Sequence, residues 1–172
     1  MSARGITPML LALALGCGLG CGGPSFAGNV FRDGEAAYRV GELDPGWRRI
    51  AMEDNDLAWH NERIGAVAQV NASCDPADDV PLGALTNHLL IGFTDRELRS
   101  SQTVPLDGRE ALRSHLVARL DGVPRELLLY VLKKDRCTYD FALIAPPGDA
   151  FREAEPAFER LVAGFTTEVG RP

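Results

Sequence analysis

Lysine is nearly absent from this sequence, which holds only Lys133 and Lys134. Residues 1–27 carry Arg4 as their one charged side chain, and the rest of the chain carries 17 basic and 24 acidic side chains, a net charge of −7. An acidic body without a basic stripe is repelled by phosphate backbones and by anionic lipid headgroups. The composition therefore argues against a nucleic-acid partner.

The sequence also lacks an apolar run long enough to span a bilayer, which takes roughly 20 residues. Its longest apolar stretch, Ile6–Leu15, is interrupted by Thr7 and Pro8 and is followed by a glycine-rich segment that cannot extend a helix. A cation at Arg4 followed by a short apolar stretch is typical of a cleaved secretory signal peptide. We expect export, and not a permanent membrane-spanning helix.

Two cysteines follow the apolar stretch and suggest how the exported chain is held. Ala14-Leu15-Gly16-Cys17 resembles a bacterial lipobox, in which the cysteine is lipidated and becomes the mature N-terminus, and Gly18-Leu19-Gly20-Cys21 is a poorer second copy. Neither copy has the leucine that the lipobox prefers. Cys17 directly follows the apolar run, whereas lipidation of Cys21 leaves no odd thiol behind. Ordinary cleavage after Ser25-Phe26-Ala27 is the alternative, and it would release a soluble protein.

These features divide the chain into four parts. We expect a signal peptide at residues 1–16, a lipidated glycine-rich tether at 17–29, one folded domain at 30–168 and a short tail at 169–172. From Val30 onward the sequence has no internal repeat and no linker long enough to separate two domains.

Motifs of the common enzyme classes are missing. The sequence contains no G-x-S-x-G elbow, no C-x-x-C pair and no glycine-rich phosphate loop between a strand and a helix. His60, His88 and His115 are not spaced as metal ligands on one helix turn. His115 shares a strand face with Arg113 and Arg119, so we expect that face to be solvated. The acidic clusters, residues 53–56 and 75–79, do not follow the calcium-loop pattern. We therefore expect no catalytic residue, no metal and no cofactor.

Alternation of apolar and polar residues dominates the domain and predicts strands. The Asp-Gly pairs at 107–108 and 121–122 predict tight hairpin turns. Leu82, Leu85, Leu89 and Phe93 have helical spacing, which predicts a helix over residues 81–93. A second helix follows, with Pro156 expected to kink or restart it. The predicted strands are Ala37–Val40, Trp47–Met52, Leu57–His60, Ile64–Cys74, Leu98–Leu106, Glu110–Leu120, Arg125–Lys134 and Cys137–Ala145. Small residues share one face of Ile64–Cys74 and suggest that another element packs closely on it, and residues 127–132 are apolar on both faces, which predicts a central strand.

This pattern predicts an α+β fold with a mostly antiparallel sheet and two main helices. The order of elements over about residues 30–168 resembles the PsbP-like domain. The elements that carry the resemblance are Tyr38, the Pro45-Gly46-Trp47 turn, the strand Ile64–Cys74, the helix Pro81–Phe93 and the closing phenylalanine-rich helix. The resemblance rests on the order and spacing of elements. It implies a binding or accessory module and transfers no catalytic residue.

Two pairs of residues in the domain invite a functional interpretation. Cys74 and Cys137 are its only cysteines, and in an oxidising compartment an even count predicts a disulfide. Trp47 and Trp59 lie on early strands that we place near a sheet edge. Such residues are usually buried, but if they flank a groove they are the first candidates for contact with a partner or ligand.

We therefore expect a non-enzymatic lipoprotein of the cell envelope, anchored by its N-terminal lipid on the periplasmic side, that binds or assists an envelope protein. The alternative is a periplasmic carrier of a small molecule or lipid that serves an envelope transporter. A carrier needs an apolar cavity between sheet and helix, and a core filled by Leu85, Leu89, Phe93 and Phe158 would count against it.

Overall fold

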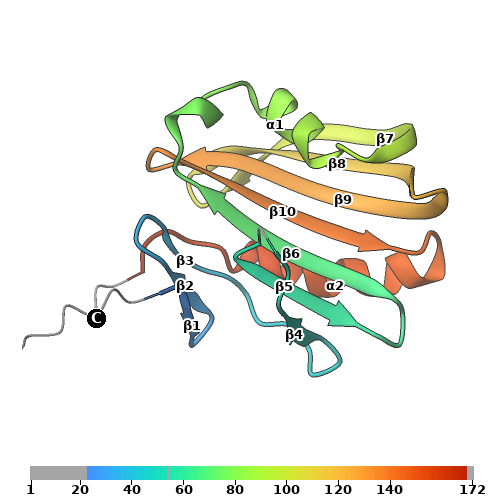
Figure 1. Cartoon of the computed structure of the whole chain (residues 1–172), viewed down its shortest axis with the longest axis horizontal. Helices are drawn as coiled ribbons and strands as arrows, with labels where there is room; N and C mark the ends of the chain where they lie inside the picture. Colours follow the sequence, from blue (N-terminus) through green and yellow to red (C-terminus); the bar gives the residue numbers. More distant parts are fainter. Residues whose placement is uncertain (1–22, 54, 170–172) are drawn as a thin grey trace, which may run out of the picture.

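The computed structural model describes residues 23–53 and 55–169. A large antiparallel sheet has the strand order β4-β5-β6-β10-β9-β8-β7. Its strands are β4 (Arg48–Ile50), β5 (Leu57–Asn61), β6 (Ala66–Ser73), β7 (Phe93–Leu106), β8 (Arg109–Leu120), β9 (Val123–Lys134) and β10 (Cys137–Ala145). A small sheet beside it holds β1 (Ser25–Ala27), β2 (Val30–Arg32) and β3 (Ala37–Arg39) (Figure 1).

Two-residue turns join the last four strands. Both central residues of each turn have positive φ angles, from 47° at Asp107 to 77° at Gly122. This conformation matches the right-handed twist of a hairpin and explains the two Asp-Gly pairs. The β9–β10 turn has the same conformation with Asp135 and Arg136, at φ 53° and 67°. The predicted meander is thereby confirmed, with β10 beginning and ending at the expected residues.

The helices cover opposite faces of the large sheet, as successive residues of β9 show. Leu128 and Leu132 belong to the larger core, which α2 (Asp149–Ala163) closes with side chains such as Phe158. Leu127 and Leu129 belong to a smaller core next to α1 (Leu82–Leu89). The strand is thus buried on both faces, as expected from its apolar sequence. Figure 1 shows α1 along the upper part of the sheet and α2 behind β6 and β10.

The alanine-rich face of β6 makes room for α2. Ala66, Ala68 and Val70 are fully buried in the larger core. Small side chains let a helix approach the sheet closely. The expectation of a close neighbour on this face is therefore confirmed.

Three expectations about the helices and the tether need correction. The first helix ends at Leu89 and not near Phe93, because Gly92 adopts φ 88° and Phe93 already begins β7. Phe93 is buried in the smaller core, so its spacing reflected burial and not helix length. Of the two outcomes expected at Pro156, a kink or a restart of the second helix, the restart is excluded, because Pro156 lies inside a continuous α2.

The expected tether also contains structure at its C-terminal end. Ser25–Ala27 form β1 and pair with β2, with Phe26 opposite Phe31. The folded part of the chain therefore includes residues that we had assigned to a flexible spacer. A three-residue strand next to a glycine-rich segment gives too short an alternation to be recognised.

Candidate functional site

A disulfide joins the end of β6 to the start of β10. The Sγ atoms of Cys74 and Cys137 lie 2.00 Å apart, and 63 positions separate the two residues in the sequence. The predicted pairing is confirmed. The disulfide lies at the end of the sheet where β7, β9 and β6 finish and where β8 and β10 begin.

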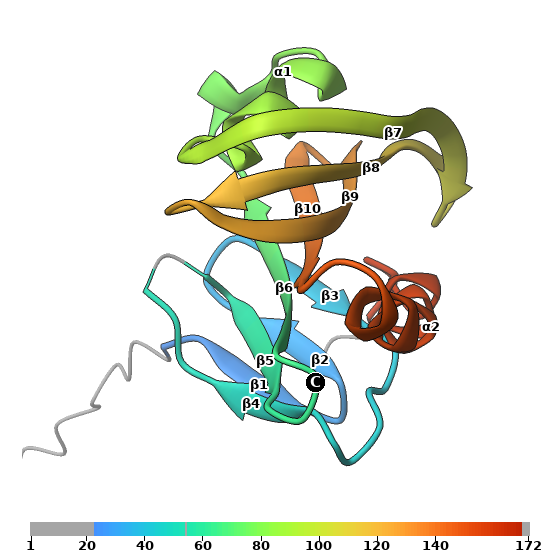
Figure 2. The same cartoon turned by 90° about the vertical axis from the view of Figure 1, so that its right-hand side faces the viewer.

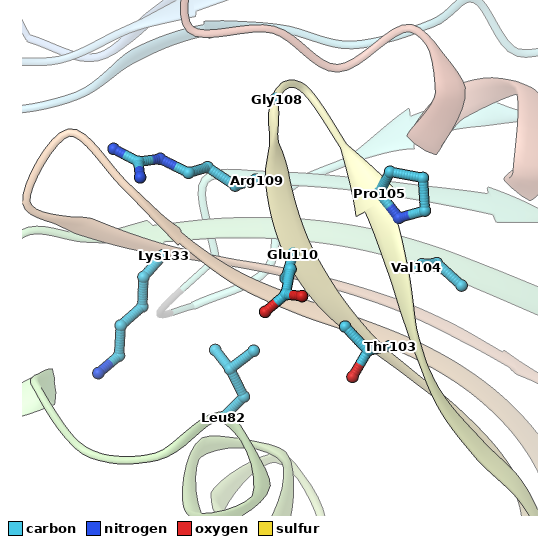
Figure 3. Close-up of a pocket in the computed structure, with 8 residues that line it drawn as sticks. All are labelled: Leu82, Thr103, Val104, Pro105, Gly108, Arg109, Glu110 and Lys133. Carbon is cyan, nitrogen blue, oxygen red and sulfur yellow. The ribbon is translucent and has the colours of Figure 1, made fainter.

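Two hollows open on the surface at this end. The first, of about 750 Å³, lies between the start of α1 and the β7–β8 turn. Figure 3 shows Leu82, Thr103, Glu110 and Lys133 directed toward it from separate elements, and Arg109 directed away. The second, of about 800 Å³, lies beside the disulfide. Both are lined by Arg109 and Lys133, so they adjoin.

The cations around the hollows fall into two groups. Lys133 Nζ lies 2.8 Å from Asp79 Oδ1, and Lys134 Nζ lies 2.7 Å from Asp107 Oδ2. Arg109 and Arg136 are exposed and form no ion pair with another residue in the described part of the chain. Two guanidinium groups are therefore available to an incoming ligand.

The pair of Lys134 and Asp107 is the more buried one and fixes the β7–β8 turn. Burial alone would raise the pKa of Asp107, but hydrogen bonds from Lys134 and from the Thr167 backbone N–H lower it below its usual value. The segment after α2 is thereby held against the turn. This contact supports the shape of the hollow and is not itself a binding group.

Asp140 is a half-buried acid on β10. It lies two residues after Thr138, and Thr138 lines the second hollow. Burial, with the nearby charges of Asp56 and Asp78, raises the pKa of Asp140 to about 7. Its carboxyl group has no hydrogen-bond or ion-pair partner among the residues described. We had not singled out this residue, although an acid at an interior position of an apolar strand is a signal that could have found it.

Asp56 is also perturbed but has partners. Its Oδ2 accepts hydrogen bonds from the Tyr38 hydroxyl at 3.0 Å and from the Ala72 backbone N–H at 2.9 Å. Burial raises the pKa of Asp56 against the effect of these bonds. Burial and the Asp56 charge also raise the pKa of Tyr38, so this hydroxyl stays a neutral donor. The pair joins the small sheet to the large one and has a structural role.

The histidines lie apart from one another. His115 was expected on a solvated face, but its ring stacks on Phe151 of α2 at 5.0 Å between centroids. Its Nε2 lies 2.8 Å from Glu126 Oε1. Arg113 on the same face is likewise covered by α2, where it pairs with Glu155 and Glu159. The solvated-face interpretation was wrong because α2 extends over this part of the sheet.

No group of three or more His, Cys, Asp or Glu side chains suited to hold a metal ion occurs within residues 23–53 and 55–169. The acids at 75–79 instead shape the chain before α1. Asp75 Oδ1 accepts a hydrogen bond from Ala77 N and caps the 3-10 helix η1 (Pro76–Asp78). Within the same residues no helix is long and apolar enough to cross a membrane.

Both tryptophans are buried. Trp47 and Trp59 are each 8% exposed and belong to the larger core. Trp59 packs edge-on against Phe26 of β1, and the Arg49 guanidinium lies 4.6 Å from the centre of the Phe26 ring. Neither tryptophan lines either of the two hollows. Their burial therefore favours a packing role over contact with a ligand. Cys17 and Cys21 lie outside the described residues.

No protein-family model matches the chain, and no protein of curated function matches its sequence. Solved structures match its fold. The solution structure of cyanobacterial PsbP (CyanoP) from Synechocystis sp. PCC 6803 has a TM-score of 0.58 and 15% sequence identity over 87% of this chain and 95% of that one. LpqN, described as involved in cell envelope biogenesis of Mycobacterium tuberculosis, has a TM-score of 0.53 and 11% identity over 83% of this chain and 88% of LpqN.

A crystal structure from Bacteroides thetaiotaomicron VPI-5482 has a TM-score of 0.51 and 13% identity over 76% of this chain and 48% of that one. At these identities the likeness concerns the fold alone. The chain has a PsbP-like α+β fold.

Proposed function

We propose that the chain is a non-enzymatic accessory protein of the bacterial cell envelope. In this proposal a lipid on Cys17, with Cys21 as the alternative, holds it on the periplasmic side, and the folded domain binds an envelope protein. The disulfide between Cys74 and Cys137 supports an oxidising compartment. The fold shared with LpqN is compatible with this location.

The position of β1 is the observation that favours an anchored chain over a released one. Cleavage after Ala27 would remove all of β1, which pairs with β2 and places Phe26 against Trp59 and Arg49. A signal peptidase site inside a strand of the folded domain is a poor candidate. Cleavage before Cys17 or Cys21 leaves this strand intact, so the structure favours lipidation.

The two adjoining hollows support a binding role. They expose the guanidinium groups of Arg109 and Arg136, which form no ion pair with another described residue. Exposed cations that have no internal partner are free to pair with acidic groups of a ligand. We therefore assign the partner contact to this end of the sheet.

The packing counts against the carrier alternative. Phe158 is fully buried between α2 and the sheet, and Leu85 and Phe93 are buried on the α1 side with Leu89 packed beside them. These four side chains fill the space that a carried lipid would need. The first hollow lies between the start of α1 and the end of the sheet, but it is open at the surface and is not an enclosed apolar cavity, and the second lies beside the disulfide.

Crosslinking in intact cells tests the binding role. A photoreactive amino acid is placed at Arg136, beside the second hollow, and at Arg152, an exposed arginine on α2, as a matched control. We expect a discrete adduct from position 136 in the membrane fraction and none from position 152. Equal labelling from both positions, or none from either, would contradict the assignment of the contact to the hollows.

A further inference from the structure

The two edges of the large sheet differ in how they are protected. An edge strand exposes unpaired backbone N–H and C=O groups, and proteins usually keep such strands short, charged or bulged. β4, at one edge, has only three residues, and two of them are Arg48 and Arg49. β7, at the other edge, has 14 residues and, among residues 23–53 and 55–169, pairs on one side only, with β8.

The first half of β7 carries the usual protection. Asp95, Arg96, Glu97 and Arg99 are charged and exposed. The register with β8 shifts twice, between Thr94 and Glu97 and between Leu98 and Ser100. Bulges of this kind twist an edge and interrupt the row of backbone groups that another strand would need.

The segment Ser100–Val104, between the bulges and Pro105, has no such protection. From Ser100 to Val104 the pairing with β8 proceeds without a shift, and the sequence Ser-Ser-Gln-Thr-Val contains no charge and no proline. Ser100–Thr103 are exposed, and α1 and α2 pack on β8, β9, β10 and β6. Figure 2 shows β7 as the long outer strand of the sheet, away from α2.

The first hollow adjoins this segment. Thr103, Val104 and Pro105 form one of its walls, and Leu82 at the start of α1 lies across from them (Figure 3). Added strands are recognised by main-chain hydrogen bonds along the edge and by pockets that take alternate side chains. The edge and the hollow provide both parts.

We propose that Ser100–Val104 is a docking edge for an extended segment of the partner protein, uncharged where it pairs with these five residues, which joins the sheet as an eighth strand beside β7. Only an extended polypeptide offers a row of donors and acceptors that matches the free backbone groups of this edge. Hydroxyl and β-branched side chains on the incoming strand would pair with Ser, Thr and Val across it. This inference deepens the proposed binding role and is independent of the lipid anchor.

Two proline variants test the edge without knowledge of the natural partner. Consecutive backbone N–H groups of a strand point to opposite sides, so one of Ser101→Pro and Gln102→Pro removes a donor to β8 and the other removes an outward donor. The variant that removes the donor to β8 should lose thermal stability, and the variant that removes the outward donor should keep it. The probe is a twelve-residue peptide selected from a random phage-displayed library on the full chain purified from its own cells.

We expect the selected peptide to slow amide exchange of Ser100–Val104 at least tenfold and to lose at least tenfold in affinity for the stable proline variant. Asn87→Lys, on the exposed side of α1, is the control and should bind normally. Failure to select a peptide, or protection elsewhere with β7 unchanged, would overturn the proposal. So would concentration-dependent protection of these amides without peptide, because the occupant would then be a second copy.

The outcome is separable from that of the crosslinking experiment. An adduct from position 136 together with an unprotected β7 edge would leave the proposed binding role standing and remove the added strand. A protected edge without any adduct in cells would keep the added strand and remove the contact at the second hollow.

Discussion

The backbone N–H of Gly41 donates a hydrogen bond to the carbonyl oxygen of Leu161 at 2.8 Å, so the last turn of α2 rests directly on the chain that leaves β3. A Cβ atom at position 41 would lie 2.0 Å from the carbonyl oxygen of Arg160. A Cβ atom at Gly164, just after the helix, would lie 2.4 Å from the Cα and the backbone N of Gly41. Two glycines far apart in the sequence thus set the distance between α2 and the small sheet.

Gly41→Ala should destabilise the domain. Its Cβ would collide with backbone that cannot move without shifting α2, and overpacking of this kind costs about 1–3 kcal/mol or more. Chemical denaturation should show the loss as a lower midpoint. Gly83→Ala is the matched control, because a Cβ there meets nothing within 4 Å and alanine favours the α1 helix. A neutral Gly41→Ala would show that α2 does not rest on this residue.

Lys134→Met should destabilise the domain more than Lys133→Met. Lys134 and Asp107 are largely buried, with 13% and 14% of their side chains exposed. Removing the lysine leaves a largely buried carboxylate without its partner, at a cost of about 3 kcal/mol. Lys133 pairs with Asp79, whose side chain is 86% exposed, so its loss should change little. Urea unfolding of the two variants compares them, and equal midpoints would contradict a structural role for the buried pair.

Removal of the disulfide should lower stability strongly. The bond closes a loop across 63 positions, and the chain-entropy relation gives about 4 kcal/mol for a loop of this length. Cys74→Ala with Cys137→Ala should therefore lower the free energy of unfolding by that order, and the reduced wild-type chain should behave like the double variant. Titration of unreduced protein with a thiol reagent under denaturing conditions gives a second check, since labelling of both positions would mean that the bond is absent.

Asp140 should make the domain less stable as the pH rises. Its pKa of about 7 in the folded chain exceeds the ordinary 3.8 of an unfolded aspartate, so the folded state binds its proton more tightly. The contribution of Asp140 to the free energy of unfolding is fully present below about pH 4 and is lost as the pH rises through about 7. The loss is about 2–4 kcal/mol.

Asp140→Asn removes this titration. The variant should be more stable than wild type at pH 8, and the difference should shrink toward pH 4. Asp121→Asn, in the exposed β8–β9 turn, is the control, and thermal unfolding across this pH range is the measurement. If the difference in thermal stability between wild type and Asp140→Asn stayed constant from pH 4 to pH 8, the pH dependence would belong to other groups.

Local sequence was sufficient for the strands whose turns carry their own signal. The Asp-Gly pairs placed the hairpins of β7, β8 and β9, and the even cysteine count gave the disulfide. The end of α1 was misplaced, because Leu89 and Phe93 have helical spacing although both point into the smaller core from different elements. Periodicity reports burial, and two elements that bury the same core can share it.

The candidate site depended on contacts that no local pattern contains. Arg109 and Lys133 line the same hollows because β8 and β9 bring residues 24 positions apart to one end of the sheet. The approach of Gly41 to Gly164 and the burial of Asp140 are likewise set by packing between distant segments. Sequence patterns also placed His115 in solvent, because they do not show that α2 covers this strand.

The mass of the mature N-terminus tests the central claim most directly. The chain is isolated from the envelope of the cells that make it, and its N-terminal peptide is measured by mass spectrometry. We predict a peptide that begins at Cys17 and carries acyl groups on its cysteine, with Cys21 as the second possible start. A free amine on Gly28, or an intact leader beginning at Met1 in the soluble interior fraction, would contradict the anchored envelope protein described above.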